Sequence, residues 1–354
     1  MAYPKGVMEF PVSRVLRTIE AGWSMPQLLN AIAAAISGDG PALTVKDVGQ
    51  TEVSSEVALI VSTSGSTGAA KDVLLTGEAL LSSAHATNEY LGAQSGAIWS
   101  LLIPTSHIAG INVLTRSLQL GSVPVGSNER ADFSAIVPTQ LFRALNGDQE
   151  LLEHLSSCTS VLVGGGPLAP EIRDQAMEHG IRVVTTYGMT ESCGGVVYNG
   201  EPLPGVDLRI ISGRIAIKAP QLAIGYLQGT LPLDEGYFLT SDLGVFEAGH
   251  LEVLGRLDDQ IISGGEKLSL GAIDRFLQSS FNNPGIVTFA RADGEWGERM
   301  CIATTMQITL DEIAERLKRE FGRHASPKEI LYLEEIPYLA LGKPDRKRLE
   351  NDYK

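Results

Sequence analysis

Short apolar runs alternate with helical stretches between residues 57 and 185. Each run ends in a loop rich in glycine, serine or threonine, which is typical of a buried strand. Strands alternating with helices predict α/β layers with a mainly parallel sheet, in which ligand loops gather at the carboxyl ends of strands. The predicted strands cover residues 57–62, 98–104, 134–137, 160–163 and 181–185, and the predicted helices cover residues 77–90, 140–145 and 170–179.

The rest of the chain predicts two further structural units. Residues 206–254 consist of short β-type runs separated by glycine turns, so we expect a small antiparallel, barrel-like subdomain. From Ser269 onward the order is helix, strand, strand, helix, strand, helix, which predicts an α+β lobe of about one hundred residues. We therefore expect a large domain over residues 1–257 and a small, mobile C-terminal lobe over residues 258–354.

Charge and cysteine content exclude several classes of protein. The net charge is −14, from 28 basic and 42 acidic side chains, so we expect no nucleic-acid partner and no general attraction to anionic membranes. The start of the chain lacks a signal-peptide pattern, and no apolar stretch is long enough for membrane insertion. Cys158, Cys193 and Cys301 are scattered without CxxC spacing, which predicts buried thiols in a reducing compartment. We expect a cytoplasmic protein.

Residues 62–71 (STSGSTGAAK) follow the first predicted strand directly. Glycines let the backbone approach a ligand, while the hydroxyls and Lys71 can donate to phosphate oxygens. The spacing is not that of a Walker A loop. A flexible linker is the alternative, but a linker would not follow a buried strand and end in a lysine.

Residues 161–169 (VLVGGGPLA) join a strand to a helix through three glycines. The run fits the G-x-G-x-x-A fingerprint, so an NAD-dependent oxidoreductase is an alternative. Two features count against it. Pro167 lies in the turn into the helix, and the next strand ends in Thr-Thr-Tyr-Gly instead of a ribose-binding acid.

Four later segments carry polar side chains at strand ends or in loops. In residues 185–191 (TTYGMTE), Tyr187 could stack on a base, Thr190 could bond a phosphate oxygen and Glu191 could hold Mg²⁺. Taken alone, this segment also fits a polar turn and a helix cap. The other three are 237–242 (YFLTSD), 255–259 (GRLDD) and 341–346 (LGKPDR), which alone fit a turn, a surface ion pair and a basic loop.

Together and in this order, these segments resemble the adenylate-forming superfamily of acyl-CoA synthetases, luciferases and peptide-synthetase adenylation domains. The resemblance extends from about residue 57 to about residue 350 and implies ATP, Mg²⁺ and the co-substrate CoA. It departs from the superfamily in the short region before residue 62 and in the residues before Gly342.

The resemblance assigns roles by motif. It implies that the large domain carries the ATP and acid site, with Thr190 at the α-phosphate, Glu191 on Mg²⁺ and Lys71 at the phosphates. On the small lobe, Lys343 would be the catalytic lysine. The remaining implied positions are Ser62, Thr63, Ser64, Gly65, Ser66, Thr67 and Gly68 for the phosphates; Gly165, Gly166, Pro167, Thr186, Tyr187, Gly188 and Met189 around the adenine; Asp242 and Arg256 for the ribose; Asp258 as the hinge; and Gly264 and Gly265 along the CoA channel.

Residues 104–116 (PTSHIAGINVLTR), 185–200 and the short N-terminus are similar to the o-succinylbenzoate–CoA ligase family of menaquinone biosynthesis, in its compact actinobacterial form. This similarity implies that His107, Arg116, Gly188 and Ser192 line the acid pocket. A bidentate arginine suits the second carboxylate of a dicarboxylic substrate, although Arg116 also fits a charge on a helix surface.

The implied reaction is ATP-dependent adenylation of 2-succinylbenzoate followed by transfer to CoA. The alternatives are a ligase for another aryl or alkyl acid and a stand-alone module that loads a carrier protein. We expect small-molecule substrates as partners and leave a homo-oligomer open.

Overall fold

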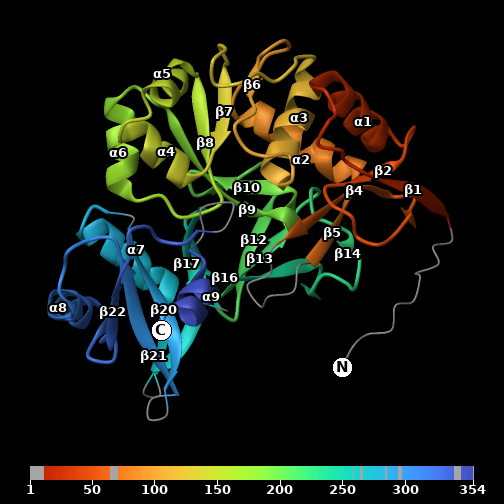
Figure 1. Cartoon of the computed structure of the whole chain (residues 1–354). Coiled ribbons are helices and arrows are strands. Elements are labelled where there is room, and N and C mark those ends of the chain that lie inside the picture. The colour runs from red at the N-terminus through yellow and green to blue at the C-terminus, as the bar shows by residue number, and fades with distance from the viewer. Residues whose placement is uncertain are drawn as a thin grey trace.

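The computed structural model describes residues 12–63, 71–257, 259–263, 266–283, 285–293, 297–338 and 344–353. Figure 1 shows a large body that runs from β1 to β17, and a smaller lobe, drawn in blue, that follows it. The expected fold class is confirmed: α/β layers and a small antiparallel β-subdomain precede a small C-terminal α+β lobe.

The first sheet is mixed and has the strand order β14-β5-β4-β2-β1-β3. Strands β1, β2 and β4 are parallel, while β3, β5 and β14 run antiparallel to their neighbours. The expectation of one mainly parallel sheet is therefore wrong for this part of the chain, because β4 turns back into β5 and forms a hairpin. The strands are β1 Ser13–Thr18, β2 Ala42–Thr44, β3 Glu52–Ser54, β4 Val57–Thr63, β5 Lys71–Thr76 and β14 Gly225–Tyr226.

The second sheet has the order β11-β10-β9-β8-β7-β6, and β6 to β9 are parallel as predicted. Strand β9 continues past Thr185, where a loop was expected, because β10 folds back and pairs with its second half. The predicted strand over residues 98–104 is reduced to the short β6. The strands are β6 Trp99–Ser100, β7 Phe133–Ile136, β8 Ser160–Val163, β9 Val183–Met189, β10 Gly194–Tyr198 and β11 Glu201–Pro202.

Two sets of helices bury the faces of these sheets. Apolar side chains of α1, α2 and α3 pack on β4 and β5, and α2 and α3 also pack on β6 to β9. Helices α4, α5 and α6 cover the opposite face of the second sheet (Figure 1). The helices are α1 Met25–Ser37, α2 Gly77–Tyr90, α3 Ile108–Leu120, α4 Pro138–Leu145, α5 Gln149–Ser157 and α6 Pro170–Glu178.

The third sheet confirms the antiparallel β-subdomain. Its order is β12-β13-β16-β15, with β17 paired to β16, and every pairing is antiparallel. The strands are β12 Asp207–Ile211, β13 Arg214–Lys218, β15 Leu233–Asp234, β16 Tyr237–Glu247 and β17 His250–Arg256.

The C-terminal lobe has its own sheet, β19-β18-β21-β20 with β22 on β21, and separate apolar clusters. The order of elements predicted from Ser269 onward is confirmed. They are β18 Gln260–Ser263, β19 Glu266–Ser269, α7 Leu270–Ser280, β20 Ile286–Asp293, β21 Gly297–Thr304, α8 Leu310–Phe321, β22 Glu329–Tyr332 and α9 Arg346–Asp352.

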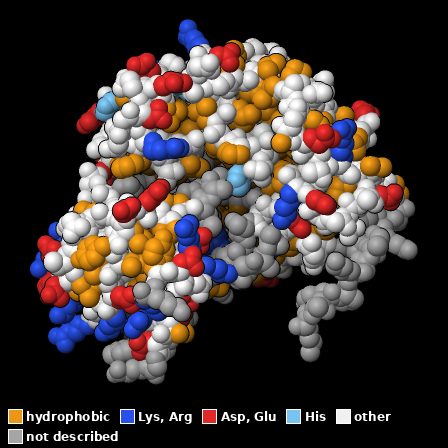
Figure 2. Space-filling model, in the orientation of Figure 1, with side chains coloured by type: hydrophobic (Ala, Val, Ile, Leu, Met, Phe, Trp, Pro, Cys, Tyr) orange, Lys and Arg blue, Asp and Glu red, His pale blue; other side chains and the backbone are white. Residues whose placement is uncertain are grey.

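Polar contacts join this lobe to the large body. The Ser279 hydroxyl donates to Glu171 Oε1 at 2.7 Å, and the Arg275 guanidinium donates to the Leu254 carbonyl. Figure 2 shows many charged side chains on this face of the small lobe. Within the described ranges, no helix combines the length and apolar character needed to cross a membrane.

Candidate functional site

The two ends of the predicted phosphate loop lie side by side on β4 and β5. Ser62 pairs with Asp72 and Thr63 with Lys71 in the antiparallel ladder. The Ser62 hydroxyl donates to Asp72 Oδ1, and Asp72 also accepts from Gln228 Nε2 at 3.1 Å. Residues 64–70, and with them Ser64, Gly65, Ser66, Thr67 and Gly68, lie outside the described residues. The structure therefore fixes the base of the loop, with Lys71 exposed at its end.

Thr190 and Glu191 lie in a 3₁₀ turn, Thr190–Ser192, directly after β9. Glu191 Oε1 accepts a hydrogen bond from the Tyr226 hydroxyl at 2.9 Å. The Lys71 ammonium lies 5.1 Å from the centroid of the same tyrosine ring. The predicted metal-binding carboxylate and the predicted phosphate-binding lysine thus share one neighbour.

Asp242 and Arg256 face each other on β16 and β17. Their side chains form an ion pair at 3.4 Å, and the Tyr187 hydroxyl donates to Asp242 Oδ2 at 2.9 Å. Burial and the neighbouring Asp242 charge raise the pKa of Tyr187 well above its usual range. The predicted ribose pair and the predicted base-stacking tyrosine therefore form one cluster, although the contact made by Tyr187 is through its hydroxyl.

The glycine-rich turn after β8 lies against β9. A Cβ atom on Gly164 would be 2.2 Å from Thr186 Oγ1, so a larger residue would push the turn away from the strand. Gly165 has a φ of +83°, a conformation that favours glycine. The turn ends where α6 begins, at Pro170. Gly164 therefore lies against Thr186, while Gly165 and Gly166 face Val137 and Pro138 at the start of α4.

Close packing also governs β9 where it meets β10. A Cβ atom on Gly188 would lie 1.9 Å from the Gly194 carbonyl oxygen, so the strands can pair here only if position 188 is glycine. Ser192 is fully buried, and its hydroxyl lies within hydrogen-bonding distance of the Gly194 carbonyl at 2.8 Å and the Met189 carbonyl at 3.1 Å, either of which can accept its one proton. In this arrangement Ser192 shapes the turn and presents no exposed surface.

Arg116 is buried in α3, with 3% of its surface exposed, so its interpretation as a surface charge is wrong. The guanidinium lies over the Trp99 ring, 4.8 Å from the centroid, and Nε has no hydrogen-bond partner. Burial lowers the pKa of Arg116, and the groups that oppose this shift are Tyr198 and Cys193, not a carboxylate. A buried cation without an acidic partner among the described residues is costly unless a ligand supplies the anion.

His107 lies at the start of the same helix. It occupies the N-cap position of α3 and is half-buried. Burial lowers the pKa of His107 below the usual value for histidine, which favours the neutral imidazole.

The segment that contains Lys343 is held at both ends. Residues 339–343 lie outside the described residues, but Tyr338 and Pro344 form a β-bridge and the Asp345 amide donates to the Pro337 carbonyl at 2.8 Å. Arg346 then binds the buried Asp274 and lies 3.7 Å from Asp259. The predicted hinge residue Asp258 and the predicted CoA-channel residues Gly264 and Gly265 also lie outside the described residues.

The metal implied by the family resemblance, Mg²⁺, fits the oxygen atoms of this turn. Mg²⁺ is commonly held by one or two carboxylates together with substrate phosphates, and Glu191 offers such a carboxylate next to Thr190, the predicted ligand of the α-phosphate. No group of three or more His, Cys, Asp or Glu side chains is placed for a metal ion in the described part of the chain. The three cysteines are buried, and burial raises the pKa of the thiols of Cys158, Cys193 and Cys301 to about 11, about 12 and about 11.

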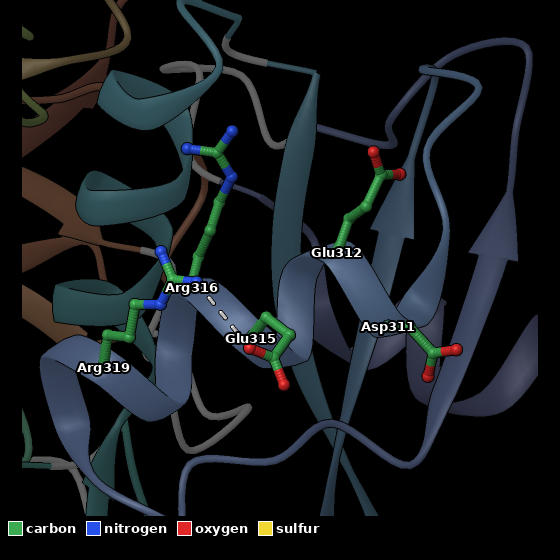
Figure 3. A pocket seen from close by; sticks show the side chains of 5 residues that line it. All are labelled: Asp311, Glu312, Glu315, Arg316 and Arg319. Carbon is green, nitrogen blue, oxygen red and sulfur yellow. Dashed lines mark ion pairs between the residues drawn. The ribbon is translucent and has the colours of Figure 1, made fainter.

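A shallow hollow on the outer face of α8 is formed by charged side chains alone. Figure 3 shows Asp311, Glu312, Glu315, Arg316 and Arg319 projecting from this helix. Glu315 and Arg319 form an exposed ion pair at 3.8 Å, a type of contact that contributes little energy. None of the predicted site residues is among them.

The site includes residues that the sequence analysis did not identify. Tyr226 belongs to a short run, QLAIGYL (221–227), whose glycine and tyrosine resemble any turn after an apolar segment. Trp99 is fully buried under Arg116 and carries no motif. Only pairing between distant segments brings these side chains to the site.

Comparison with known proteins gives consistent matches. The family model described as AMP-binding enzyme matches residues 13–227. The chain is 35% identical to "Probable 2-succinylbenzoate--CoA ligase" of Mycobacterium tuberculosis, over 94% of this chain and 96% of that protein. It is 30% identical to "2-succinylbenzoate--CoA ligase" of Enterococcus faecalis, over 81% of this chain and 68% of that protein.

Solved structures share the fold. The structure of a single-residue variant of E. coli MenE with bound OSB-AMS superimposes with a TM-score of 0.74 at 25% identity, covering 95% of this chain and 81% of that chain. The MenE structure from Bacillus subtilis in complex with the acyl-adenylate intermediate OSB-AMP has a TM-score of 0.74 at 21% identity, covering 95% of this chain and 83% of that chain.

Proposed function

Because the chain belongs to the AMP-binding enzyme family, we propose that this enzyme is an acid–thiol ligase that acts on 2-succinylbenzoate in menaquinone biosynthesis. The products would be 2-succinylbenzoyl-CoA, AMP and pyrophosphate. The named relatives support the substrate. The observation that carries the proposal within this chain is Arg116, a buried cation without an acidic partner among the described residues, on a helix that packs against the nucleotide-site strands.

In the first half-reaction, a carboxylate oxygen of the acid attacks the α-phosphorus of ATP. The bond from that phosphorus to the bridging oxygen breaks, and pyrophosphate leaves. Bound Mg²⁺ would supply positive charge at the phosphates. The chain's own part is to hold the reactants in line and to offset developing negative charge, with Lys71 and Thr190 at the phosphates and Glu191 on the metal. Asp242 and Arg256 would hold the ribose.

Arg116 would bind the carboxylate of the acid that does not react. A guanidinium can donate two parallel hydrogen bonds to a carboxylate, and burial strengthens each of them because water is excluded. The pairing would also relieve the cost of the isolated buried charge. A monocarboxylic acid would leave that cost in place, so this site discriminates between the two classes of acid.

In the second half-reaction, the thiol of CoA attacks the acyl carbon and AMP leaves. We propose that the chain divides into residues 1–257 and a mobile lobe, 258–354, that rotates about Asp258 between the two steps. Lys343 would serve the first step, and Gly264 and Gly265 would border the CoA channel in the second. Two hydrogen bonds between the described parts of the lobes, from Arg275 and Ser279, support this division, because so few contacts can be exchanged when the lobe rotates. A hinge needs only a few residues to absorb the backbone change of such a rotation.

The buried cysteines support a cytoplasmic location, and we propose small molecules as the only partners that the reaction requires. The cofactors would be ATP, Mg²⁺ and CoA as co-substrate.

Pyrophosphate release across a panel of acids tests the proposal. Purified enzyme with Mg·ATP is assayed with 2-succinylbenzoate, benzoate, succinate and a medium-chain fatty acid, each with and without CoA. We expect strong release with 2-succinylbenzoate alone, accelerated by CoA. Robust release with another acid would overturn the assigned substrate, and acceleration by a phosphopantetheine carrier protein but not by CoA would overturn the assigned acceptor. No release with any acid would contradict the ligase function itself.

A further inference from the structure

We propose that Tyr226 is a positioning residue that fixes the metal-binding carboxylate of Glu191 and the phosphate-binding ammonium of Lys71 relative to each other. The inference rests on the proposed function, because it concerns the nucleotide half of that reaction. It assigns one side chain, outside every motif noted in the sequence, to two parts of the site that lie 120 residues apart along the chain.

The contact with Glu191 is a charge-assisted hydrogen bond. The Tyr226 hydroxyl donates to Oε1 at 2.9 Å, and Oε2 receives no hydrogen bond from the described residues. Carboxylates accept through both oxygens, so this geometry leaves one of them for a cation. A phenol that fixes a metal-ligating carboxylate acts as the outer partners of metal ligands generally do: it sets the orientation of the ligand before the metal arrives.

The contact with Lys71 is made by the ring. The ammonium lies 5.1 Å from the ring centroid, within the range of a cation–π interaction. The aliphatic chain of an exposed lysine has many rotamers, and an aromatic face that attracts its ammonium restricts them. The ring and the hydroxyl of Tyr226 therefore constrain two different groups.

The backbone holds Tyr226 firmly enough for this role. Strand β14 pairs with β5, with Tyr226 opposite Val73. On one side of the tyrosine the Ala223 amide donates to the Glu191 carbonyl at 2.8 Å, and on the other the Leu227 amide donates to the Asp72 carbonyl at 2.8 Å. The segment is thus tied to the turn that carries Glu191 and to the strand that carries Lys71.

The protonation state agrees with the hydrogen-bond direction. Burial, the Glu191 charge and the hydrogen bond to Glu191 all raise the pKa of Tyr226 above the usual value for tyrosine. The 2.9 Å contact is therefore a hydrogen bond that the phenol donates to the carboxylate.

Tyr226→Phe and Tyr226→Leu separate the two contacts. The first removes the hydroxyl and keeps the ring, and the second removes both. Binding of Mn²⁺, used as a spectroscopic substitute for Mg²⁺, is measured by electron paramagnetic resonance with α,β-methylene-ATP present. Loss of an outer partner of a metal ligand typically lowers affinity about 10- to 100-fold, so we expect about tenfold weaker Mn²⁺ binding by Tyr226→Phe. Tyr226→Leu should also raise the KM for ATP.

The matched control is Tyr237→Phe. The Tyr237 hydroxyl also donates a hydrogen bond to a carboxylate, that of Asp207. Tyr237 lies on β16 and Asp207 on β12, both in the third sheet, which does not contain Glu191. We expect wild-type Mn²⁺ binding by this variant. In all variants, thioester formation from supplied acyl-adenylate should equal that of the wild type, because that step does not use the metal site.

The outcomes separate the inference from the proposed function. Wild-type Mn²⁺ affinity in a folded Tyr226→Phe protein, or an equal loss in Tyr237→Phe, would overturn the role of Tyr226. A wild-type enzyme that neither binds Mn²⁺ in the presence of the nucleotide nor releases pyrophosphate would overturn the proposed function instead.

Discussion

Two arginines of this chain are removed from solvent to different degrees and differ in their hydrogen-bond partners. Arg14 on β1 donates to four backbone carbonyls, including those of Ala34 and Ala35 near the end of α1. The Ala34 carbonyl also accepts from the Gly40 amide at 3.0 Å, whereas the Ala35 carbonyl, one of the last four of the helix, has Arg14 as its donor. Arg116 on α3 is more deeply buried, and its Nε has no partner. Arg14 thus satisfies backbone carbonyls of the fold, whereas Arg116 has no acidic partner among the described residues.

Replacing each arginine by methionine should therefore have opposite effects on stability. Arg116→Met removes an isolated buried charge, so we expect the free energy of unfolding to rise by about 1 kcal/mol or more. Arg14→Met leaves carbonyls without donors, so we expect a loss of about 1–3 kcal/mol. Chemical denaturation measures both. A loss of stability in Arg116→Met equal to that in Arg14→Met would contradict the idea that Arg116 is unpaired.

Although Arg116→Met should gain stability, we expect it to bind the acid substrate more weakly. A hydrogen-bonded charge contributes about 1.5–3 kcal/mol, so the KM of Arg116→Met for 2-succinylbenzoate should rise about 10- to 150-fold. Arg14→Met should keep the wild-type KM at a temperature where it is folded. Steady-state pyrophosphate release gives both KM values. An unchanged KM in Arg116→Met would contradict the proposal that Arg116 binds the acid.

At the scale of elements, a buried histidine ties α5 to two parallel strands. His154 Nε2 is hydrogen-bonded to Ser100 Oγ at 2.9 Å, and that hydroxyl donates to Ser134 Oγ at 2.9 Å. Burial lowers the pKa of His154, and backbone hydrogen bonds involving Glu129 and Ser127 oppose this shift only in part. The charged form of the imidazole does not suit this position between helix and sheet.

This predicts a pH dependence of stability with a definite sign. Below the unfolded-state pKa of about 6.5, the unfolded chain binds a proton that the folded chain does not, so stability falls as the pH decreases from about 6.5 toward the lower folded pKa. The limit is about 1.4 kcal/mol per pH unit for each such proton. Denaturation at pH 7.5, 6.5 and 5.5 should show a smaller loss in His154→Gln than in the wild type.

The control for this series is His85→Gln, whose side chain is 74% exposed. It should retain the pH dependence of the wild type. If His154→Gln and the wild type lose stability in parallel, the buried imidazole does not cause the decrease.

Local sequence signals predicted some of these elements and could not predict others. The helix predicted over residues 77–90 has the same bounds as α2 in the structure, where the Thr76 side chain caps its first turn. Helix α3 is buried on nearly every side, so it lacks the polar face by which a helix is recognised in a sequence. Strand β6 was predicted but is much shorter than the run over residues 98–104. Strand β14 is too short to give any period, and no strand was predicted at β5, between the phosphate loop and the helix over residues 77–90.

The same limit applies to the site. The residues of 185–191 suggested a phosphate role for Thr190 and a Mg²⁺ role for Glu191, whereas Asp242 and Arg256 were assigned to the ribose through family resemblance alone. That Tyr187 joins the first pair, and that Tyr226 joins Glu191 to Lys71, depends on the strand register between distant segments. No local pattern encodes that register.

At the scale of the whole molecule, the proposed reaction requires two arrangements of the lobes. Arg346 connects the segment after Lys343 to the buried Asp274 and to Asp259, beside the predicted hinge. This network would make the lysine segment and the hinge move as one body, because the ends of residues 339–343 are also joined by the bridge between Tyr338 and Pro344.

Substitutions at the hinge and at the lysine should therefore separate the half-reactions. Lys343→Ala should lower adenylate formation by about 100-fold or more, an electrostatic loss in the first step, and spare thioester formation from supplied acyl-adenylate. Asp258→Pro should do the reverse, because proline restricts the backbone change that rotation needs. Rapid-quench measurement of each step tests this, and equal losses in both steps for Lys343→Ala would contradict the two-arrangement account.

The most direct test of the central claim follows an oxygen atom. The enzyme is supplied with 2-succinylbenzoate whose carboxylates carry ¹⁸O, together with Mg·ATP and CoA, and the AMP formed is analysed by mass spectrometry. If a carboxylate oxygen attacks the α-phosphorus and the acyl carbon–oxygen bond later breaks, one ¹⁸O atom must leave in the phosphate of AMP. We expect AMP heavier by about two mass units and a thioester that has lost one labelled oxygen. Unlabelled AMP, or ADP and phosphate as products, would contradict adenylation as the chemistry of this site.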